Sequence, residues 1–163
     1  MTDFAKVLQV LAQNQVAYVL VGGVAATVHG SARLTQDIDL LYQRSPDNIR
    51  RLVRALEPSC PYLRGAPAGL PFQWDAQTVK QGLNFTLTTA IGDIDLFGEL
   101  IGGGTFEKLV AHTIRVNVFG VECACLDLEH LITVKRAAGR PKDLETIAEL
   151  EALREEQGKD SVG

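Results

Sequence analysis

Apolar residues recur at helix-like spacing in some segments and at strand-like spacing in others, which predicts a domain of mixed helices and strands. We expect helices at 3–13, 24–29, 46–56, 127–137 and 141–157, and strands at 18–21, 37–42, 83–88, 93–97, 113–118 and 121–126. Segment 58–82 is expected to be a loop, and 102–104 a turn. This order predicts an α+β fold in which helices pack on a mixed sheet and two helices end the chain.

The size and charge of the chain narrow its class. Its 163 residues fit one domain, which we expect to span 1–157, with 158–163 as a frayed tail. A hydrophobic fraction of 46% excludes disorder, and a net charge of −4 argues against a protein that coats nucleic acid. No apolar run approaches the ~20 residues of a membrane span, and the first residues do not resemble a signal peptide. We therefore expect a cytoplasmic protein with no membrane partner.

The three cysteines add little chemistry to this picture. Cys60, Cys123 and Cys125 form no metal-ligand spacing, and an odd number fits a reducing compartment. Cys123 and Cys125 alternate on one face of an expected strand, so we interpret them as small core residues.

A repeated acidic motif carries the first chemical signal. The string Asp-Ile-Asp-Leu occurs at 37–40 and again at 93–96. In a strand, Asp37 and Asp39 project from the same face with their Cα atoms about 6.5–7 Å apart, so their charges need compensation. A divalent cation supplies it, and two such ions about 3.5–4 Å apart can clamp an in-line phosphoryl displacement. The alternative is a pair of solvated strand ends without function.

A glycine pair precedes this motif at the end of a buried strand. Gly22 and Gly23 would let the backbone approach a ligand closely, and the helix that follows offers free N–H groups to phosphates. Arg33 and Thr35 lie in the loop between the glycines and the first Asp pair. Arg33 either holds a triphosphate or pairs with these carboxylates, and Thr35 either contacts phosphate or bonds its own backbone.

These two features together resemble a known family. The pattern Leu20-Val-Gly22-Gly23, then Arg33-x-Thr35-x-Asp37-x-Asp39-Leu40, resembles the nucleotidyltransferase superfamily of the polymerase-β type. It is most similar to the small "minimal" bacterial nucleotidyltransferases of toxin–antitoxin and abortive-infection systems. The resemblance implies a polymerase-β-like fold in which the D-x-D motif binds metal ions and a neighbouring strand supplies a third carboxylate. Many members carry Gly-Ser where this chain has Gly22-Gly23.

The third carboxylate has two candidates. Asp95 lies inside an expected strand between apolar neighbours, as the family pattern requires, and we choose it. Asp93 follows a turn glycine and is the alternative. The segment from Lys135 to Asp143 also resembles the basic helical turn near the end of such chains. Lys135 and Lys142 are the expected phosphate ligands, unless the basic residues only form a solvated helix end.

The resemblance implies a metal-dependent nucleotidyltransferase that moves a nucleoside monophosphate from a nucleoside triphosphate to a hydroxyl. The metal ligands and catalytic residues would be Asp37, Asp39 and Asp95. The cofactor would be Mg²⁺, most simply two ions, with Mn²⁺ as a substitute. The nucleotide would contact Gly22, Gly23, Arg33, Thr35, Lys135 and Lys142.

The acceptor stays open between a partner toxin's side chain, a tRNA end and a small antibiotic. The net charge disfavours tRNA, although Arg44, Arg50, Arg51 and Arg54 form a candidate basic patch. A helical toxin or antitoxin partner and a homodimer are further options. Two other functions compete: a phosphatase with a nucleophilic Asp, which the glycine pair disfavours, and a non-catalytic antitoxin-like module that keeps the fold.

Overall fold

Seven strands form one mixed sheet at the centre of the computed structural model, which describes residues 1–162 and the side chains of residues 1–159. The sheet has the order β3-β4-β5-β2-β1-β9-β8. Its strands are β1 (Tyr18–Val21), β2 (Asp37–Tyr42), β3 (Tyr62–Leu63), β4 (Phe85–Thr89), β5 (Gly92–Phe97), β8 (Thr113–Val118) and β9 (Val121–Leu126). The β2–β5 and β1–β9 pairs are parallel and the others antiparallel, so the expected mixed sheet is confirmed.

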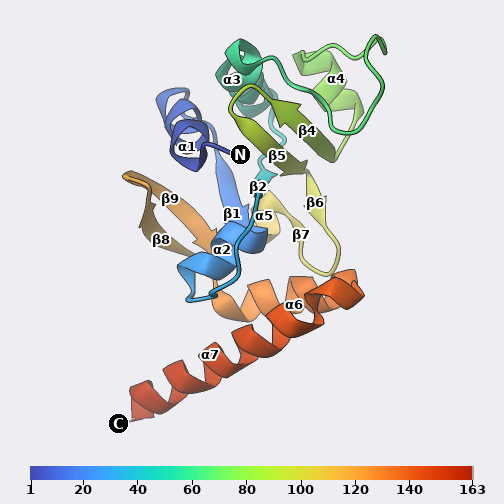
Figure 1. The fold of residues 1–163 in the computed structure, drawn as a ribbon. Helices are drawn as coiled ribbons and strands as arrows, with labels where there is room; N and C mark the ends of the chain where they lie inside the picture. Colours follow the sequence, from blue (N-terminus) through green and yellow to red (C-terminus); the bar gives the residue numbers. More distant parts are fainter. Residues whose placement is uncertain (163) are drawn as a thin grey trace.

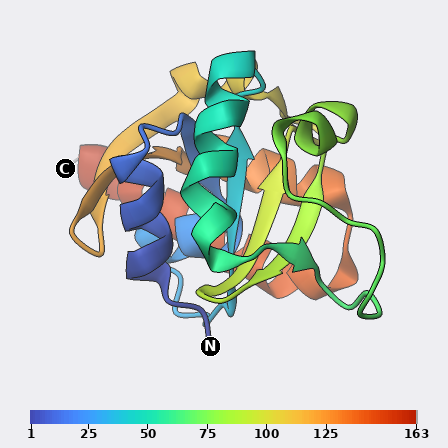
Figure 2. The same cartoon turned by 90° about the horizontal axis from the view of Figure 1, so that it is seen from above.

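Helices cover both faces of this sheet (Figures 1 and 2). The helices are α1 (Phe4–Gln13), α2 (Gly22–Val28), α3 (Pro46–Leu56), α4 (Ala76–Gln81), α5 (Phe106–Leu109), α6 (Leu128–Ala138) and α7 (Leu144–Val162). Helices α1 and α3 lie side by side over one face, while α2, α6 and the long α7 lie on the other (Figures 1 and 2). The expected α+β architecture is therefore confirmed, and two helices end the chain.

The alternation of β2 and β5 sorts their side chains between the two faces. Ile38, Leu40, Ile94 and Leu96 are buried in the hydrophobic core, whereas the aspartates between them point to the opposite face. Burial of four such side chains contributes roughly 1.5–3 kcal/mol each. The apolar half of each motif thus anchors the strands that carry the acidic half.

Local signals explain most helix boundaries. Asp3, Ser45 and Asp127 accept hydrogen bonds from backbone N–H groups in the first turns of α1, α3 and α6. Pro46 occupies the first turn of α3, and Gly139 ends α6 with a left-handed φ of 65°. The sequence predicts these boundaries to within one or two residues because the signals are local.

The segments around the expected loops differ from the sequence prediction. Segment 58–82 is not only a loop, because it contains β3 and α4. The expected turn at 102–104 connects a hairpin of β6 (Glu99–Leu100) and β7 (Gly104–Thr105), followed by α5. All these elements are too short to show a periodic apolar pattern. Helix α2 begins at Gly22 rather than at residue 24, because the glycines themselves form its first turn.

The C-terminal helix is longer than the sequence predicts, while two of the three cysteines are buried as predicted. Residues 158–162, expected to be a frayed tail, continue α7, and Gly163 lies outside the described residues. Cys123 and Cys125 are buried as expected, and Cys60 is exposed. Among the described residues, no helix combines the length and the apolar character needed to cross a bilayer.

Asn48 ties the start of α3 to the ends of β1 and β2. Its side chain is fully buried and bonds Ala17 N (2.7 Å), Ala17 O (2.9 Å) and Gln43 O (2.8 Å). We expect Asn48→Ala to lower the free energy of unfolding by about 2–3 kcal/mol, because three buried backbone groups lose their partner. Urea unfolding measures this, with Asn117→Ala at the exposed β8–β9 turn as control. An equal loss in both variants would contradict the assignment.

Candidate functional site

Parallel pairing of β2 with β5 brings the two acidic motifs together. Asp37 lies opposite Asp93, and Asp39 lies opposite Asp95. Carboxylate oxygens of Asp37, Asp39 and Asp95 all lie within 4.8 Å of one another. The structure thus places the first Asp pair beside Asp95, the candidate chosen from the sequence, while Asp93 lies on the same face one step along β5.

The three carboxylates repel one another, and two of them have raised pKa values. Burial, together with the neighbouring carboxylates of Asp37 and Asp95, raises the pKa of Asp39 to about 8, and Lys135 opposes this rise. Burial likewise raises the pKa of Asp95, opposed by the Arg64 guanidinium. Among the described residues, Asp39 Oδ1 and Asp95 Oδ1 are buried oxygens without a hydrogen-bond partner. Converging carboxylates with such unpaired oxygens fit a divalent cation, which prefers oxygen ligands.

A cation that the sequence analysis missed lies beside these carboxylates. Arg64, which directly follows β3, forms an ion pair with Asp95, with 2.8 Å between Nη2 and Oδ1. Its Nε lies 3.5 Å from Asp93 Oδ1, and its Nη1 lies 3.7 Å from Asp37 Oδ2. Arg64 therefore compensates part of the negative charge that the motifs concentrate.

The glycine pair lies directly against the first acidic motif. Gly22 has a left-handed φ of 69°, and a Cβ built there would overlap the Asp39 carboxylate. A Cβ on Gly23 would lie 2.8 Å from Thr35 Cβ. Thr35 Oγ1 donates to Asp37, 3.0 Å from its Oδ1 and 3.1 Å from its backbone O. Of the two roles considered for Thr35, the structure thus shows the local hydrogen bond, which orients Asp37.

The expected phosphate ligands are only partly brought together. Lys135 is buried beside Asp143, with 4.0 Å between Nζ and Oδ1, and burial lowers its pKa while Asp143 and Asp39 oppose this. Arg140 donates from Nε to Asp143 Oδ2 at 2.6 Å. Lys142 is exposed and does not line the cavity beside Asp39, where Arg140 lies instead.

Arg33 forms an ion pair with α7 rather than with the acidic motif. Its Nη2 lies 2.5 Å from Oε2 of Glu145 on α7, and the pair is exposed. Ser31 in the same loop donates to Glu149 Oε1, also at 2.5 Å. Of the options considered for Arg33, neither a carboxylate of the acidic motif nor the cavity beside Asp39 is its neighbour in this structure. These contacts fasten the loop 31–36 to α7.

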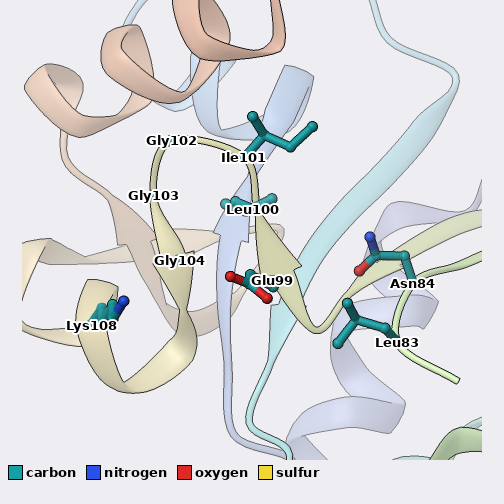
Figure 3. A pocket seen from close by; sticks show the side chains of 9 residues that line it. All are labelled: Leu83, Asn84, Glu99, Leu100, Ile101, Gly102, Gly103, Gly104 and Lys108. Atoms are coloured by element: carbon teal, nitrogen blue, oxygen red, sulfur yellow. The ribbon is translucent and has the colours of Figure 1, made fainter. Parts of the chain in front are cut away.

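Two adjoining cavities lie on one side of the site, and Asp39 lines the first of them. The first, of about 270 Å³, is bounded by Asp39, Lys135 and Arg140 and has apolar walls from β5 and α6. The second, of about 480 Å³, shares part of its lining with the first, namely Asn84, Glu99, Leu100 and Ile101. Figure 3 shows its polar side chains arriving from three segments, with Lys108 of α5 across from Glu99 of β6.

Two arginines of the candidate basic patch, and also His29 and Trp74, have internal partners. Arg44 donates to Tyr42 and to the carbonyls of Val79 and Lys80, and Arg50 pairs with Asp47. His29 Nε2 bonds Leu126 O, and Trp74 Nε1 donates to Val53 O. Arg50, Arg51 and Arg54 of the candidate basic patch lie on α3, which covers the opposite face of the sheet from α2 and α6 (Figures 1 and 2).

Comparison with known proteins places the fold. No protein-family model matches the chain, and no curated protein matches it. Among solved structures, it is similar to the crystal structure of ANT(2″)-Ia in complex with adenylyl-2″-tobramycin, an aminoglycoside nucleotidyltransferase. The TM-score is 0.51 and the identity 14%, over 96% of this chain and 95% of that one. The chain has a nucleotidyltransferase fold. At this identity the nucleotidyltransferase fold is shared, while the activity must be argued from this chain's own residues.

The close approach of Gly22 to Asp39 leads to a prediction about metal binding by this protein. Gly22→Ala should displace the Asp39 carboxylate and weaken Mn²⁺ binding at least about tenfold, because the new methyl group occupies its place. Isothermal titration calorimetry measures the affinity. Gly120→Ala is the matched control, since Gly120 has a φ of 81° and no atom within 4 Å of its built Cβ. Equal Mn²⁺ affinity in both variants would contradict the steric argument.

The raised pKa of Asp39 generates a second prediction, for the metal-free protein. The folded state holds this proton more tightly than the unfolded state, so its contribution to stability is full below the unfolded pKa near 3.8 and is lost as the pH rises through about 8. Asp39→Asn should therefore raise the free energy of unfolding by about 2 kcal/mol at about pH 8.5 and far less at about pH 5.

Urea unfolding in a chelating buffer at both pH values tests this, with Asp47→Asn on exposed α3 as control. A stabilisation of Asp39→Asn that is the same at both pH values would show that the carboxylate does not carry the pH dependence.

Proposed function

We propose that this protein is a metal-dependent nucleotidyltransferase, which transfers a nucleoside monophosphate from a nucleoside triphosphate to a hydroxyl. The observation that supports this most strongly is the convergence of Asp37, Asp39 and Asp95 within 4.8 Å on one face of a nucleotidyltransferase fold. Half-buried carboxylates that are this close repel one another, and a bound cation would relieve this repulsion. The phosphatase alternative is disfavoured by the fold.

The nucleotide would occupy the cavity beside Asp39. Lys135 and Arg140 supply positive charge there, and the apolar walls suit a nucleoside. The close approach of Gly22 leaves its backbone beside the Asp39 carboxylate, where a triphosphate oxygen would share the cation. Lys135, buried and held near Asp143, is the better placed of the two cations to contact phosphate oxygens.

Asp37 and Asp39 would hold the divalent cation, which when bound neutralises the triphosphate oxygens. Thr35 orients Asp37 for this role through its hydrogen bond to Oδ1. Asp95, whose pKa burial raises, is the base that accepts the proton of the attacking hydroxyl. The acceptor oxygen forms a bond to the α-phosphorus, and the bond to the bridging oxygen breaks with its electron pair leaving on pyrophosphate.

A small-molecule hydroxyl is the acceptor that we favour. The solved structure similar to this chain holds adenylyl-2″-tobramycin, a small-molecule product. A tRNA acceptor would need a basic approach to the carboxylates, but Arg44 is used internally and the α3 surface lies on the far side of the sheet. A toxin or antitoxin partner remains a proposal of the sequence resemblance, which co-purification would test.

The activity is tested with α-³²P-labelled nucleoside triphosphates and Mg²⁺ against three acceptor pools: tobramycin and related small molecules, tRNA, and cell extract. We expect label in the small-molecule pool. Asp37→Asn, Asp39→Asn and Asp95→Asn should each reduce transfer at least about 100-fold, because each removes a charge on which positioning depends.

Asp47→Asn removes a similar charge from the exposed α3 surface and should leave the rate unchanged. Transfer of label at equal rates by the wild type and the three site variants would overturn the assignment. Binding of a protein partner without any turnover would favour the non-catalytic module instead.

A further inference from the structure

Arg64 is held where it is by more than the carboxylates. Its backbone N donates to Thr86 O at 3.0 Å, and its Nη2 donates to Leu87 O at 2.7 Å. Strand β4 thus fixes both the backbone and the guanidinium of Arg64. Only 26% of the side chain is exposed. A guanidinium anchored in this way is part of the site's architecture rather than a mobile surface charge.

The position of Arg64 is the one that a second divalent cation would need. Its guanidinium pairs with Asp95 at 2.8 Å and lies 3.7 Å from Asp37, so it contacts both the third carboxylate and the first acidic motif. Asp39, by contrast, forms no ion pair with Arg64 in the described part of the chain, although the buried Oδ1 atoms of Asp39 and Asp95 both lack a hydrogen-bond partner there. The Asp95 end of the site is already occupied by a cation, and the Asp39 end is open.

The charges of the site agree with this division. When all are ionised, the carboxylates of Asp37, Asp39, Asp93, Asp95 and Asp143 meet three cations, Arg64, Lys135 and Arg140, so two negative charges stay uncompensated. One divalent cation neutralises them. A second ion near Asp95 would have to displace Arg64, breaking its bonds to Asp95 and Leu87 and leaving a half-buried guanidinium without its carboxylate partner.

We propose that Arg64 takes the place of a second divalent cation, so that the site binds a single ion at Asp37 and Asp39. This inference rests on the proposed nucleotidyl transfer and replaces the two ions expected from the sequence. Arg64 acts as a positioning residue: it fixes the orientation of Asp95 and supplies a permanent positive charge beside it. That charge does not depend on the concentration of free metal.

The inference is tested by electron paramagnetic resonance of Mn²⁺ bound to the full chain with a non-hydrolysable nucleoside triphosphate analogue. Two Mn²⁺ ions about 3.5–4 Å apart give a spin-coupled signal that a single ion does not. We expect the wild type to bind one Mn²⁺ per chain with an uncoupled signal. Arg64→Gln, which removes the charge and keeps a polar side chain, should bind two and show the coupled signal.

Arg115→Gln is the matched control, because Arg115 pairs with Glu122 on the exposed β8–β9 hairpin. It should behave like the wild type. Thermal unfolding adds a readout without activity: in chelator, Arg64→Gln should unfold at a lower temperature than Arg115→Gln, and saturating Mn²⁺ should raise its midpoint more than that of the wild type. This comparison also shows whether Arg64→Gln folds.

A coupled two-ion signal in the wild type would overturn the inference and leave the proposed nucleotidyl transfer intact. Nucleotidyl transfer together with a single uncoupled ion in the wild type supports it, even if Arg64→Gln is too unstable to measure. Failure of the wild type to bind any Mn²⁺ would contradict the proposed function, and the inference with it.

Discussion

Mutual repulsion of carboxylates on one face of the sheet is the constraint on which the rest of this structure depends. The parallel register of β2 and β5 places Asp39 opposite Asp95 and Asp37 opposite Asp93. Burial then keeps water from screening these charges, which raises the pKa of Asp39. Two cations from neighbouring elements reduce this repulsion: Arg64, which follows β3, and Lys135 of α6. A bound cation would neutralise the negative charge that Arg64 and Lys135 leave uncompensated.

The fold can hold these repelling charges because the same strands bury apolar side chains on their other face. The isoleucines and leucines of both motifs are buried in the core with residues of α1 and α3. A site held by such a core can keep unfavourable charges in place, at a cost to stability that a functional ligand would offset. The loop after α2 is fastened separately, through the contacts of Arg33 and Ser31 with α7. Rigid strands and a fastened loop together give the site its fixed geometry.

The sequence predicts the parts of this arrangement that local patterns determine. Alternation in the two acidic motifs correctly indicates which faces the aspartates and their apolar neighbours occupy, while the choice of Asp95 over Asp93, which shares its face, comes from the family resemblance. Arg64 could not be found in this way, since β3 has two residues and its position beside Asp95 depends on the pairing of β3 with β4. The partner of Arg33 is equally non-local, because Glu145 lies far along the chain.

The central claim is that the carboxylates of β2 form a cation site next to a fixed guanidinium. A crystal structure with Mn²⁺ and a non-hydrolysable nucleoside triphosphate analogue tests it most directly, through the anomalous scattering of the metal. We expect one anomalous peak, within coordination distance of Asp37 and Asp39 and of phosphate oxygens, with Arg64 still bonded to Asp95. An anomalous peak between Asp95 and Asp37 with Arg64 displaced, or no peak at these carboxylates, would contradict the account.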